Sequence, residues 1–318
     1  MLTQAIADAR AWTARSIDAP ATWYFPLPEV VLAACPSTPP EPITSLEPSA
    51  ATRIACTRVL KPVREALASG RGFAIIEAPP DYANLPMLYW LVGHALGLPI
   101  AQNVQGTVLY DVRDTGQDLS KGARFSVTSY ESSFHTDNSF GTELADYVGL
   151  LCLHTAKAGG RSQVLSGYAV HNELLARHPD VLATLYRPFH IDRRGGVQAG
   201  DAPTIQFPVI AWNGTELLFR YLRYWIEVGH EKAGEPLTPE QVRALNVFDE
   251  CLRSQELRVE FDLKPGQMFF INNRWTLHNR TAFEDHPEPE RRRHLVRLWL
   301  QQARQSRPRH PDRLSPHP

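Results

Sequence analysis

The sequence is poor in cysteine and has no long apolar run. Its four cysteines are scattered over 318 residues without a C-x-x-C pair, which argues against a zinc ribbon or a redox-active dithiol and indicates free thiols. No apolar stretch approaches the roughly 18–20 residues that cross a bilayer. The first ten residues lack the basic start and the unbroken apolar centre of a secretory signal. We therefore expect a cytoplasmic protein without a membrane partner.

An excess of charge of one sign is also missing. The 33 basic and 34 acidic residues give a net charge of −1, which argues against nucleic acid or an anionic membrane as a partner. The hydrophobic content of 43% and the charged content of 21% are typical of soluble globular proteins. A chain of this length suits one catalytic domain, residues 1–318, with two domains as the alternative, and we expect a small-molecule substrate. The composition indicates no particular oligomeric state.

Short segments in two groups have the composition of β-strands. The clearest is 147–154, which is apolar on both faces and therefore typical of a strand buried on both sides. Asn213-Gly214 between two such segments predicts a hairpin with a type I′ turn. The predicted strands cover residues 72–78, 107–112, 125–128, 147–154, 161–165, 209–212, 215–219, 257–263, 267–271, 276–280 and 294–301.

Helical patterns precede and interrupt these strands. The best-defined helix begins after Thr238, with Pro239 at its first position and Gln241 completing a capping box, and runs to about residue 254. Further helices are predicted over 49–69, 84–96, 169–177 and 179–186.

This order of elements predicts an α+β protein on a double-stranded β-helix, or jelly-roll, core. We expect the core over 107–301, an N-terminal helix and strand decoration over 1–106, and a helical insert at about 168–255. The regular strand–helix alternation of a parallel α/β sheet is missing. The polar loop at 114–123 is expected to lie over a site, and 303–318 to form a disordered tail.

Six histidines are followed two residues later by an acidic residue. On a strand, residues i and i+2 point to the same side, so an imidazole and a carboxylate at this spacing can reach one metal ion. With 12 histidines and 34 acidic residues, however, the spacing alone is not informative. The six histidines are His135, His171, His178, His190, His286 and His310.

Local structure separates these pairs. His171 lies in a predicted helix, where i and i+2 point about 200° apart. The three pairs with proline in the middle lie at a helix break, in a loop and in the tail. His190 and Asp192 remain as a competitor, although the two arginines that follow Asp192 would compete for its carboxylate. The pair formed by His135 and Asp137 is therefore favoured.

A third metal ligand is needed, because two histidines and one carboxylate with open positions make the facial triad of non-haem iron(II) oxygenases. His278 follows a predicted pair of strands that turn at Asn272-Asn273, and it stands late in the predicted β core. A sandwich of two sheets can bring it to the favoured pair.

Four blocks of sequence then occur in order. They are Phe-His-Thr-Asp-x-Ser-Phe from Phe134, Gly-Gly-x-Ser from Gly159, Pro-Gly-x-Met-x-x-x-Asn-Asn-x-x-x-x-His-x-Arg from Pro265, and Arg-His-Leu-Val-Arg-Leu-Trp-Leu from Arg293. Together they resemble the iron(II)/2-oxoglutarate-dependent dioxygenases of the taurine dioxygenase (TauD/TfdA) family. The resemblance covers about residues 107–301.

The resemblance implies a cofactor and a co-substrate site. It implies iron(II) held by His135, Asp137 and His278, with 2-oxoglutarate and O₂ as co-substrates. Arg293 matches the arginine that pairs with the distal carboxylate of 2-oxoglutarate, for which a planar guanidinium is well suited. Ser162 matches a second position that contacts this co-substrate.

The same resemblance implies substrate contacts. Arg297 matches the arginine that holds the anionic group of taurine, and it points to the same side of its strand as Arg293. Phe140 matches an aromatic residue that lines the substrate pocket. Glu131 stands just before the first block, where a carboxylate could meet a cationic group. These three residues indicate a small anionic or amino-acid-like substrate.

The implied reaction is the oxidation of an unactivated C–H bond, most simply hydroxylation, coupled to conversion of 2-oxoglutarate to succinate and CO₂. Desaturation or cyclisation at the same site are alternatives. Related halogenases replace the carboxylate ligand with a small residue, so an intact Asp137 argues against halogenation. Two interpretations from other classes stay open: a metal-binding jelly roll with hydrolase or isomerase chemistry, and a non-catalytic binding module.

Overall fold

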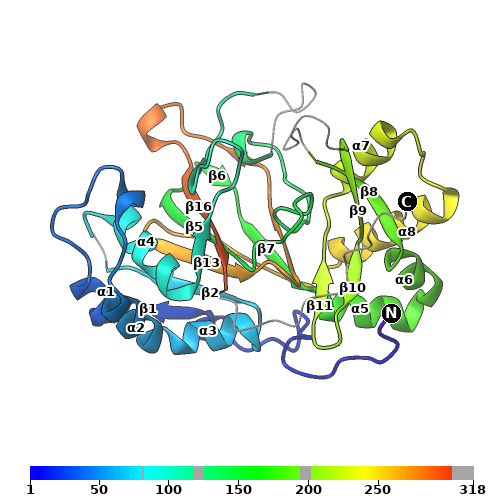
Figure 1. Cartoon of the computed structure of the whole chain (residues 1–318), viewed down its shortest axis with the longest axis horizontal. Coiled ribbons are helices and arrows are strands. Elements are labelled where there is room, and N and C mark those ends of the chain that lie inside the picture. Colours follow the sequence, from blue (N-terminus) through cyan, green and yellow to red (C-terminus); the bar gives the residue numbers. More distant parts are fainter. Residues whose placement is uncertain (80–81, 118–124, 194–201, 303–318) are drawn as a thin grey trace, which may run out of the picture.

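Two sheets of unequal size form the centre of the molecule (Figure 1). The structure is a computed structural model that describes residues 1–79, 82–117, 125–193 and 202–302. The larger sheet has the order β1-β2-β13-β5-β16-β3, with β4 also paired to β16. Its strands are β1 (Tyr24–Pro26), β2 (Phe73–Glu77), β3 (Leu98–Ile100), β4 (Leu109–Val112), β5 (Tyr147–His154), β13 (Gln267–Asn272) and β16 (His294–Gln301).

The smaller sheet has three antiparallel strands in the order β12-β7-β14, which are β12 (Arg258–Phe261), β7 (Ser162–Ser166) and β14 (Thr276–Arg280). Apolar side chains of both sheets share one core cluster, in which Phe261 of β12 lies 5.1 Å from Phe269 of β13 between ring centroids. The two sheets therefore pack against each other, and the core lies between them. Three further two-stranded pairs are β6 (Ala158–Gly159) with β15 (Phe283–Glu284), β8 (Pro188–Asp192) with β9 (Thr204–Pro208), and β10 (Ile210–Trp212) with β11 (Leu217–Phe219).

Helices gather on the two flanks of the sheets (Figure 1). The first group is α1 (Glu29–Ala33), α2 (Ala50–Val59), α3 (Lys61–Ala68) and α4 (Leu85–Leu96), and it shares a core cluster with the larger sheet. The second group is α5 (Gly167–Arg177), α6 (Pro179–Leu185), α7 (Arg223–Ala233) and α8 (Pro239–Arg253), which share another cluster with β10 and β11. Short 3₁₀ helices cover Pro20–Trp23, Ile43–Ser45, Phe125–Val127 and Pro289–Arg291. The chain is thus a mixed α+β fold.

Several predicted elements are confirmed. Strand β5 has the predicted bounds and is almost wholly buried along both faces. Helix α8 begins with the predicted capping box, in which the side chains of Thr238 and Gln241 each bond to the other residue's backbone. In both cases a strong local signal agrees with the tertiary environment.

Four predictions about local structure are wrong. The helix expected over 49–69 is two helices, α2 and α3, because Pro62 lacks an N–H group and the chain starts a new helix after Leu60. The segment at 125–128 is a 3₁₀ turn rather than a strand. The hairpin after Trp212 has a four-residue loop instead of a type I′ turn, because the side chain of Asn213 accepts hydrogen bonds from the N–H groups of Thr215 and Glu216.

The fourth correction concerns the predicted strand pair around Asn272-Asn273. Strands β13 and β14 do not pair with each other, because β13 belongs to the larger sheet and β14 to the smaller one. The turn therefore carries the chain from one sheet to the other, and this crossing places His278 between the sheets. Part of the loop predicted to lie over the site, residues 118–124, and the predicted tail at 303–318 lie outside the described residues.

Candidate metal centre

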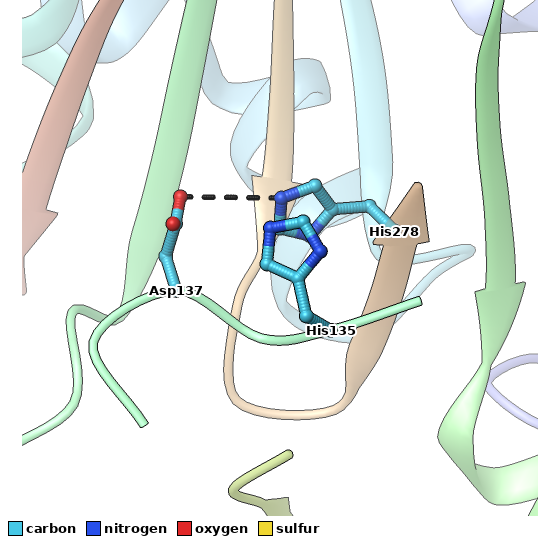
Figure 2. A group of neighbouring side chains, drawn as sticks. All are labelled: His135, Asp137 and His278. Carbon is cyan, nitrogen blue, oxygen red and sulfur yellow. Dashed lines mark ion pairs between the residues drawn. The ribbon is translucent and has the colours of Figure 1, made fainter. Parts of the chain in front are cut away.

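Two imidazoles and one carboxylate converge between the sheets (Figure 2). The side chains belong to His135, Asp137 and His278, and one potential ligand atom from each lies within 4.8 Å of the others. His278 Nε2 is 3.9 Å from Asp137 Oδ2, and the two imidazole centroids are 4.3 Å apart. The structure thus brings together the three residues that the sequence predicted as metal ligands, and they are the one such group among the described residues.

The protonation of this group suits a metal ion. Burial lowers the pKa of His135, and burial together with the neighbouring His135 lowers the pKa of His278 to about 3. Burial alone would raise the pKa of Asp137, but Arg297 and the two imidazoles outweigh burial and hold this pKa below its ordinary value. At neutral pH the site therefore offers two neutral imidazoles and one carboxylate, which is the donor set of the facial triad.

Hydrogen bonds orient each ligand. His135 Nδ1 lies 2.8 Å from the carbonyl oxygen of Ser133, which leaves Nε2 free to bind a metal. Asp137 accepts hydrogen bonds from Arg297 Nη1 at 3.0 Å and from the indole N–H of Trp299 at 3.2 Å. His278 Nδ1 is buried and has no hydrogen-bond partner among the described residues. The residues present fit a bound divalent metal.

The backbone fixes the separation of the ligands. His135 and His278 form a β-bridge, in which each N–H donates to the other residue's carbonyl at 3.0 Å. Ser133 and Asn138, which flank the ligand pair, have positive φ values of 61° and 55°. Such values are uncommon for residues other than glycine, and they mark a segment whose shape is held by its surroundings.

Asn273 supplies part of this support. Its fully buried side chain accepts from the backbone N–H of Asp137 and donates to the carbonyl oxygens of Asp137 and Ala145. The amide of Asn273 thereby connects the turn between β13 and β14 to the segment that contains His135 and Asp137. The sequence prediction did not assign this role, although the Asn-Asn block contained the residue.

A cavity of about 80 Å³ opens in front of the carboxylate ligand. Arg297 and Phe140 line it, as predicted, together with Trp225 of α7 and Trp299 of β16, which the prediction missed. Trp299 could have been found, because it stands two residues after Arg297 on the same face of one strand. The lining residues are Phe125, Ser126, Ser132, His135, Thr136, Asp137, Asn138, Ser139, Phe140, Leu222, Trp225, Arg297 and Trp299.

The predicted co-substrate residues lie outside this lining. Arg293 is buried and borders a second cavity of about 310 Å³, which Lys157 and Lys264 also line. Its guanidinium forms no ion pair with any residue that the structure describes. Ser162 is buried on β7, where it is the register partner of Arg280 on the neighbouring strand.

Glu131 is also placed away from the cavity. Its exposed carboxylate accepts a hydrogen bond from the side chain of Asn279 at 2.7 Å. The competing pair at His190 and Asp192 does lie on a strand, but Lys232 pairs with Asp192 at 2.8 Å. The structure thus separates Glu131 from the other predicted substrate contacts, and within the described part of the chain the competing pair has no third metal ligand.

Comparison with known proteins agrees with this geometry. The model of the family described as "Taurine catabolism dioxygenase TauD, TfdA family" matches residues 45–299. FR-33289 synthase of Streptomyces rubellomurinus is 31% identical over 245 residues, 74% of this chain and 70% of the relative. The taurine hydroxylase-like protein SAT17 of Stachybotrys chartarum is 32% identical over 175 residues, 54% of this chain and 42% of that protein.

Solved structures share the fold. Asparagine oxygenase in complex with Fe(II), 2S,3S-3-hydroxyasparagine and succinate has a TM-score of 0.65 at 20% identity, over 87% of this chain and 93% of the other. The non-haem iron oxygenase OrfP in complex with Fe and alpha-ketoglutaric acid has a TM-score of 0.63 at 16% identity, over the same shares. No helix among the described residues is both long and apolar enough to cross a membrane.

The family match covers most of the chain and includes all three converging side chains. The protein belongs to the TauD/TfdA family, and it is a 2-oxoglutarate-dependent dioxygenase that uses iron(II), 2-oxoglutarate and O₂.

Proposed function

We propose that this dioxygenase hydroxylates an unactivated C–H bond of a small anionic or amino-acid-like substrate. The observation that carries the proposal is the position of Arg297, whose guanidinium lines the cavity beside Asp137. A cation in this position can bind the substrate's anionic group close to the metal, so that the rest of the molecule is held in front of it.

In this proposal His135, Asp137 and His278 bind iron(II), on the strength of their convergence and of their donor set. When bound, the iron supplies the oxidative chemistry that converts 2-oxoglutarate to succinate and CO₂ and oxidises the substrate. The task of the protein is to hold both small molecules and to exclude water. Arg293 and Ser162 are assigned to 2-oxoglutarate, because Arg293 is a buried cation without an ion pair among the described residues.

Aromatic side chains support a small substrate. The cavity also has apolar lining residues, which are Phe125, Phe140, Leu222, Trp225 and Trp299. This arrangement suits a compact molecule with an anionic head and a short carbon chain. Two solved relatives in the comparisons hold amino-acid products, 3-hydroxyasparagine and (3S)-hydroxy-L-Arg. Glu131 lies outside the cavity lining, so the proposal gives it no contact with an amino group of the substrate.

The proposal extends to the architecture. We infer that the two facing sheets form a double-stranded β-helix and that residues 1–318 make one catalytic domain. The chain crossing between β13 and β14 and the shared core cluster support this inference.

A substrate panel tests the function. The enzyme would be supplied with iron(II), O₂, 2-oxoglutarate and one compound at a time from matched sets of amino acids, carboxylates, sulfonates, phosphonates and neutral analogues. Succinate would be measured as the readout. We expect stimulation by anionic compounds and little by their neutral amides or esters. Stimulation by neutral, hydrophobic compounds alone would contradict the proposal.

Product mass then decides the reaction type. Hydroxylation adds one oxygen atom, whereas desaturation or cyclisation removes two hydrogen atoms. His135→Ala and Asp137→Ala are expected to abolish succinate formation. Retention of product formation in these variants, or turnover without O₂, would instead indicate non-oxidative chemistry.

A further inference from the structure

Arg280 lies near both a predicted metal ligand and the arginine assigned to the co-substrate. It follows His278 by two residues on β14, so both side chains leave the same face of the strand. On the neighbouring strand its register partner is Ser162. Arg280 is therefore next to both a predicted metal ligand and a predicted co-substrate residue.

The guanidinium of Arg280 is only partly satisfied. Its Nη2 donates to the carbonyl oxygen of Tyr130 and, at 3.4 Å, to that of Phe125. Its Nη1 is buried without a hydrogen-bond partner among the described residues. A buried charged donor without an acceptor is unfavourable, so a ligand oxygen is expected at this position.

A second arginine shares its surroundings. The guanidiniums of Arg280 and Arg293 lie 4.7 Å and 5.1 Å from the ring centroid of Phe283, and their charges repel each other. The carboxylates that act electrostatically on Arg280 are those of Asp114, Glu131 and Asp285. Asp285 Oδ1 accepts from the backbone N–H of Arg293. Neither guanidinium forms an ion pair with a described residue, so the charged donors of both remain open to a ligand carboxylate.

The two arginines stand at positions that suit a dicarboxylate. Arg280 follows the predicted metal ligand His278 by two residues, and its guanidinium shares the ring of Phe283 with that of Arg293. A five-carbon dicarboxylate bound to the metal at one end and to Arg293 at the other would therefore have Arg280 in its neighbourhood.

We propose that Arg280 is a second guanidinium for 2-oxoglutarate, with its free Nη1 donating to the carboxylate that Arg293 also binds. The inference rests on the proposed function, in particular on the co-substrate role of Arg293. Gly160 packs beside Arg293 with a positive φ of 72°, and an added Cβ there would lie 3.2 Å from Arg293 Nε and 3.4 Å from Phe283 Cβ. A larger residue there would crowd Arg293 and Phe283.

The main alternative is a structural role, in which Arg280 only holds the segment of Phe125 and Tyr130. Because Phe125 lines the substrate cavity, such a role would affect the primary substrate. It would not change the affinity for 2-oxoglutarate in the absence of that substrate. Binding of 2-oxoglutarate alone is therefore the measurement that separates the two roles.

The experiment compares Arg280→Gln, Arg280→Lys and Arg293→Gln with wild-type enzyme. Arg291→Gln is the matched control, since Arg291 is exposed and its ion pair among the described residues is with Glu288 at 3.6 Å. Calorimetry would measure the Kd of 2-oxoglutarate for the iron(II)-loaded enzyme without O₂ and without primary substrate. Stabilisation against heat by 2-oxoglutarate gives a second readout that does not depend on turnover.

We expect Arg280→Gln to raise the Kd at least tenfold, about 1.4 kcal/mol, with unchanged iron content. Arg280→Lys should also raise the Kd, because lysine lacks the planar guanidinium that can bond to a carboxylate and to the Tyr130 carbonyl at once. The rise should be smaller than in Arg280→Gln, because lysine keeps the positive charge. The control should stay within twofold. If Arg280→Gln does not fold, Arg280→Lys decides alone, with a threefold or larger rise expected.

The outcomes are distinguishable. A Kd within twofold of wild type in the Arg280 variants, with a large rise in Arg293→Gln, overturns the role of Arg280 and leaves the proposed function intact. Unchanged Kd values in the variants of both arginines overturn this inference together with the assignment of Arg293.

Discussion

Arg297 Nη1 donates to Asp137 Oδ1 at 3.0 Å, so the predicted substrate arginine and the predicted metal carboxylate are partners. Both side chains are largely buried, and the carboxylate also receives the indole N–H of Trp299. Charge-assisted bonds of this kind hold a carboxylate ionised and oriented. Arg297 thus has two tasks, to fix the metal ligand and to bind an anionic substrate next to it.

Replacement of Arg297 by glutamine tests both tasks. We expect a 10- to 100-fold loss of iron(II) affinity, the usual cost of losing a partner of a metal ligand. Turnover with anionic substrates should fall further than the iron occupancy does. Competition with a chelator measures the first effect, and succinate formation at saturating iron measures the second. An iron affinity equal to that of the wild type would show that Arg297 does not support the metal ligand Asp137.

Trp299→Phe isolates the indole hydrogen bond. Phenylalanine keeps an aromatic wall in the cavity but cannot donate to Asp137 Oδ2. We expect about a tenfold weaker binding of iron(II) and a small change in overall stability. Trp90→Phe is the control, since the indole of Trp90 donates to the carbonyl of Leu46 in the first helix group. Equal iron affinity in both variants would contradict the prediction.

Asn273→Ala is expected to lower the free energy of unfolding by about 3 kcal/mol, because it leaves buried backbone groups of Asp137 and Ala145 without their partner. Urea unfolding of the iron-free protein measures this loss. Asn213→Ala is the comparison, since its hydrogen bonds serve a partly exposed loop and their loss should cost less. A loss equal to that of the control would show that the amide does not support the ligand segment.

His94, which is not part of the metal centre, should make the stability of the protein depend on pH. Its ring packs 4.6 Å from Trp90 between centroids, its nitrogens have no partner among the described residues, and burial lowers its pKa. In the unfolded chain His94 has a pKa of about 6.5 and binds a proton more readily than in the folded protein. The free energy of unfolding therefore falls as the pH drops below about 6.5. The slope from one proton is at most about 1.4 kcal/mol per pH unit.

His94→Leu should reduce this acid sensitivity. Unfolding curves at pH 7.5 and 5.5 would be compared for both proteins, and the difference between the two pH values is expected to be smaller in the variant. An identical difference would mean that His94 already titrates normally in the folded protein.

Strong local patterns made much of the central structure predictable. Strands β5 and β16 have the bounds predicted from their apolar residues, and α8 begins at its capping box. The triad was predictable because the sequence blocks limited the choice of ligands. The expected strand at His135 and Asp137 is absent: His135 forms an isolated β-bridge and Asp137 lies in a turn. The convergence of the triad could not be derived from periodicity, because the chain changes sheets after β13 and no local signal marks this crossing.

Helix α7 shows why other elements were missed. It has no side-chain N-cap, and Gly229 in its interior is unfavourable for a helix. The structure gives the reason for this glycine: an added Cβ would lie 2.5 Å from the carbonyl oxygen of His190 on β8. The close contact between helix and strand determines the residue, and such a contact is tertiary information. Trp225, which lines the cavity, was missed along with the helix that carries it.

The position of β16 inside the larger sheet has a consequence for the timing of assembly. This last strand lies between β5 on one side and β3 and β4 on the other, and it supplies both Arg297 and Trp299 to the metal carboxylate. Until β16 has been synthesised, β3 and β4 have no strand that joins them to β5, and Asp137 lacks the two side chains that donate to it. The ligand set is therefore oriented only when this strand has joined the sheet.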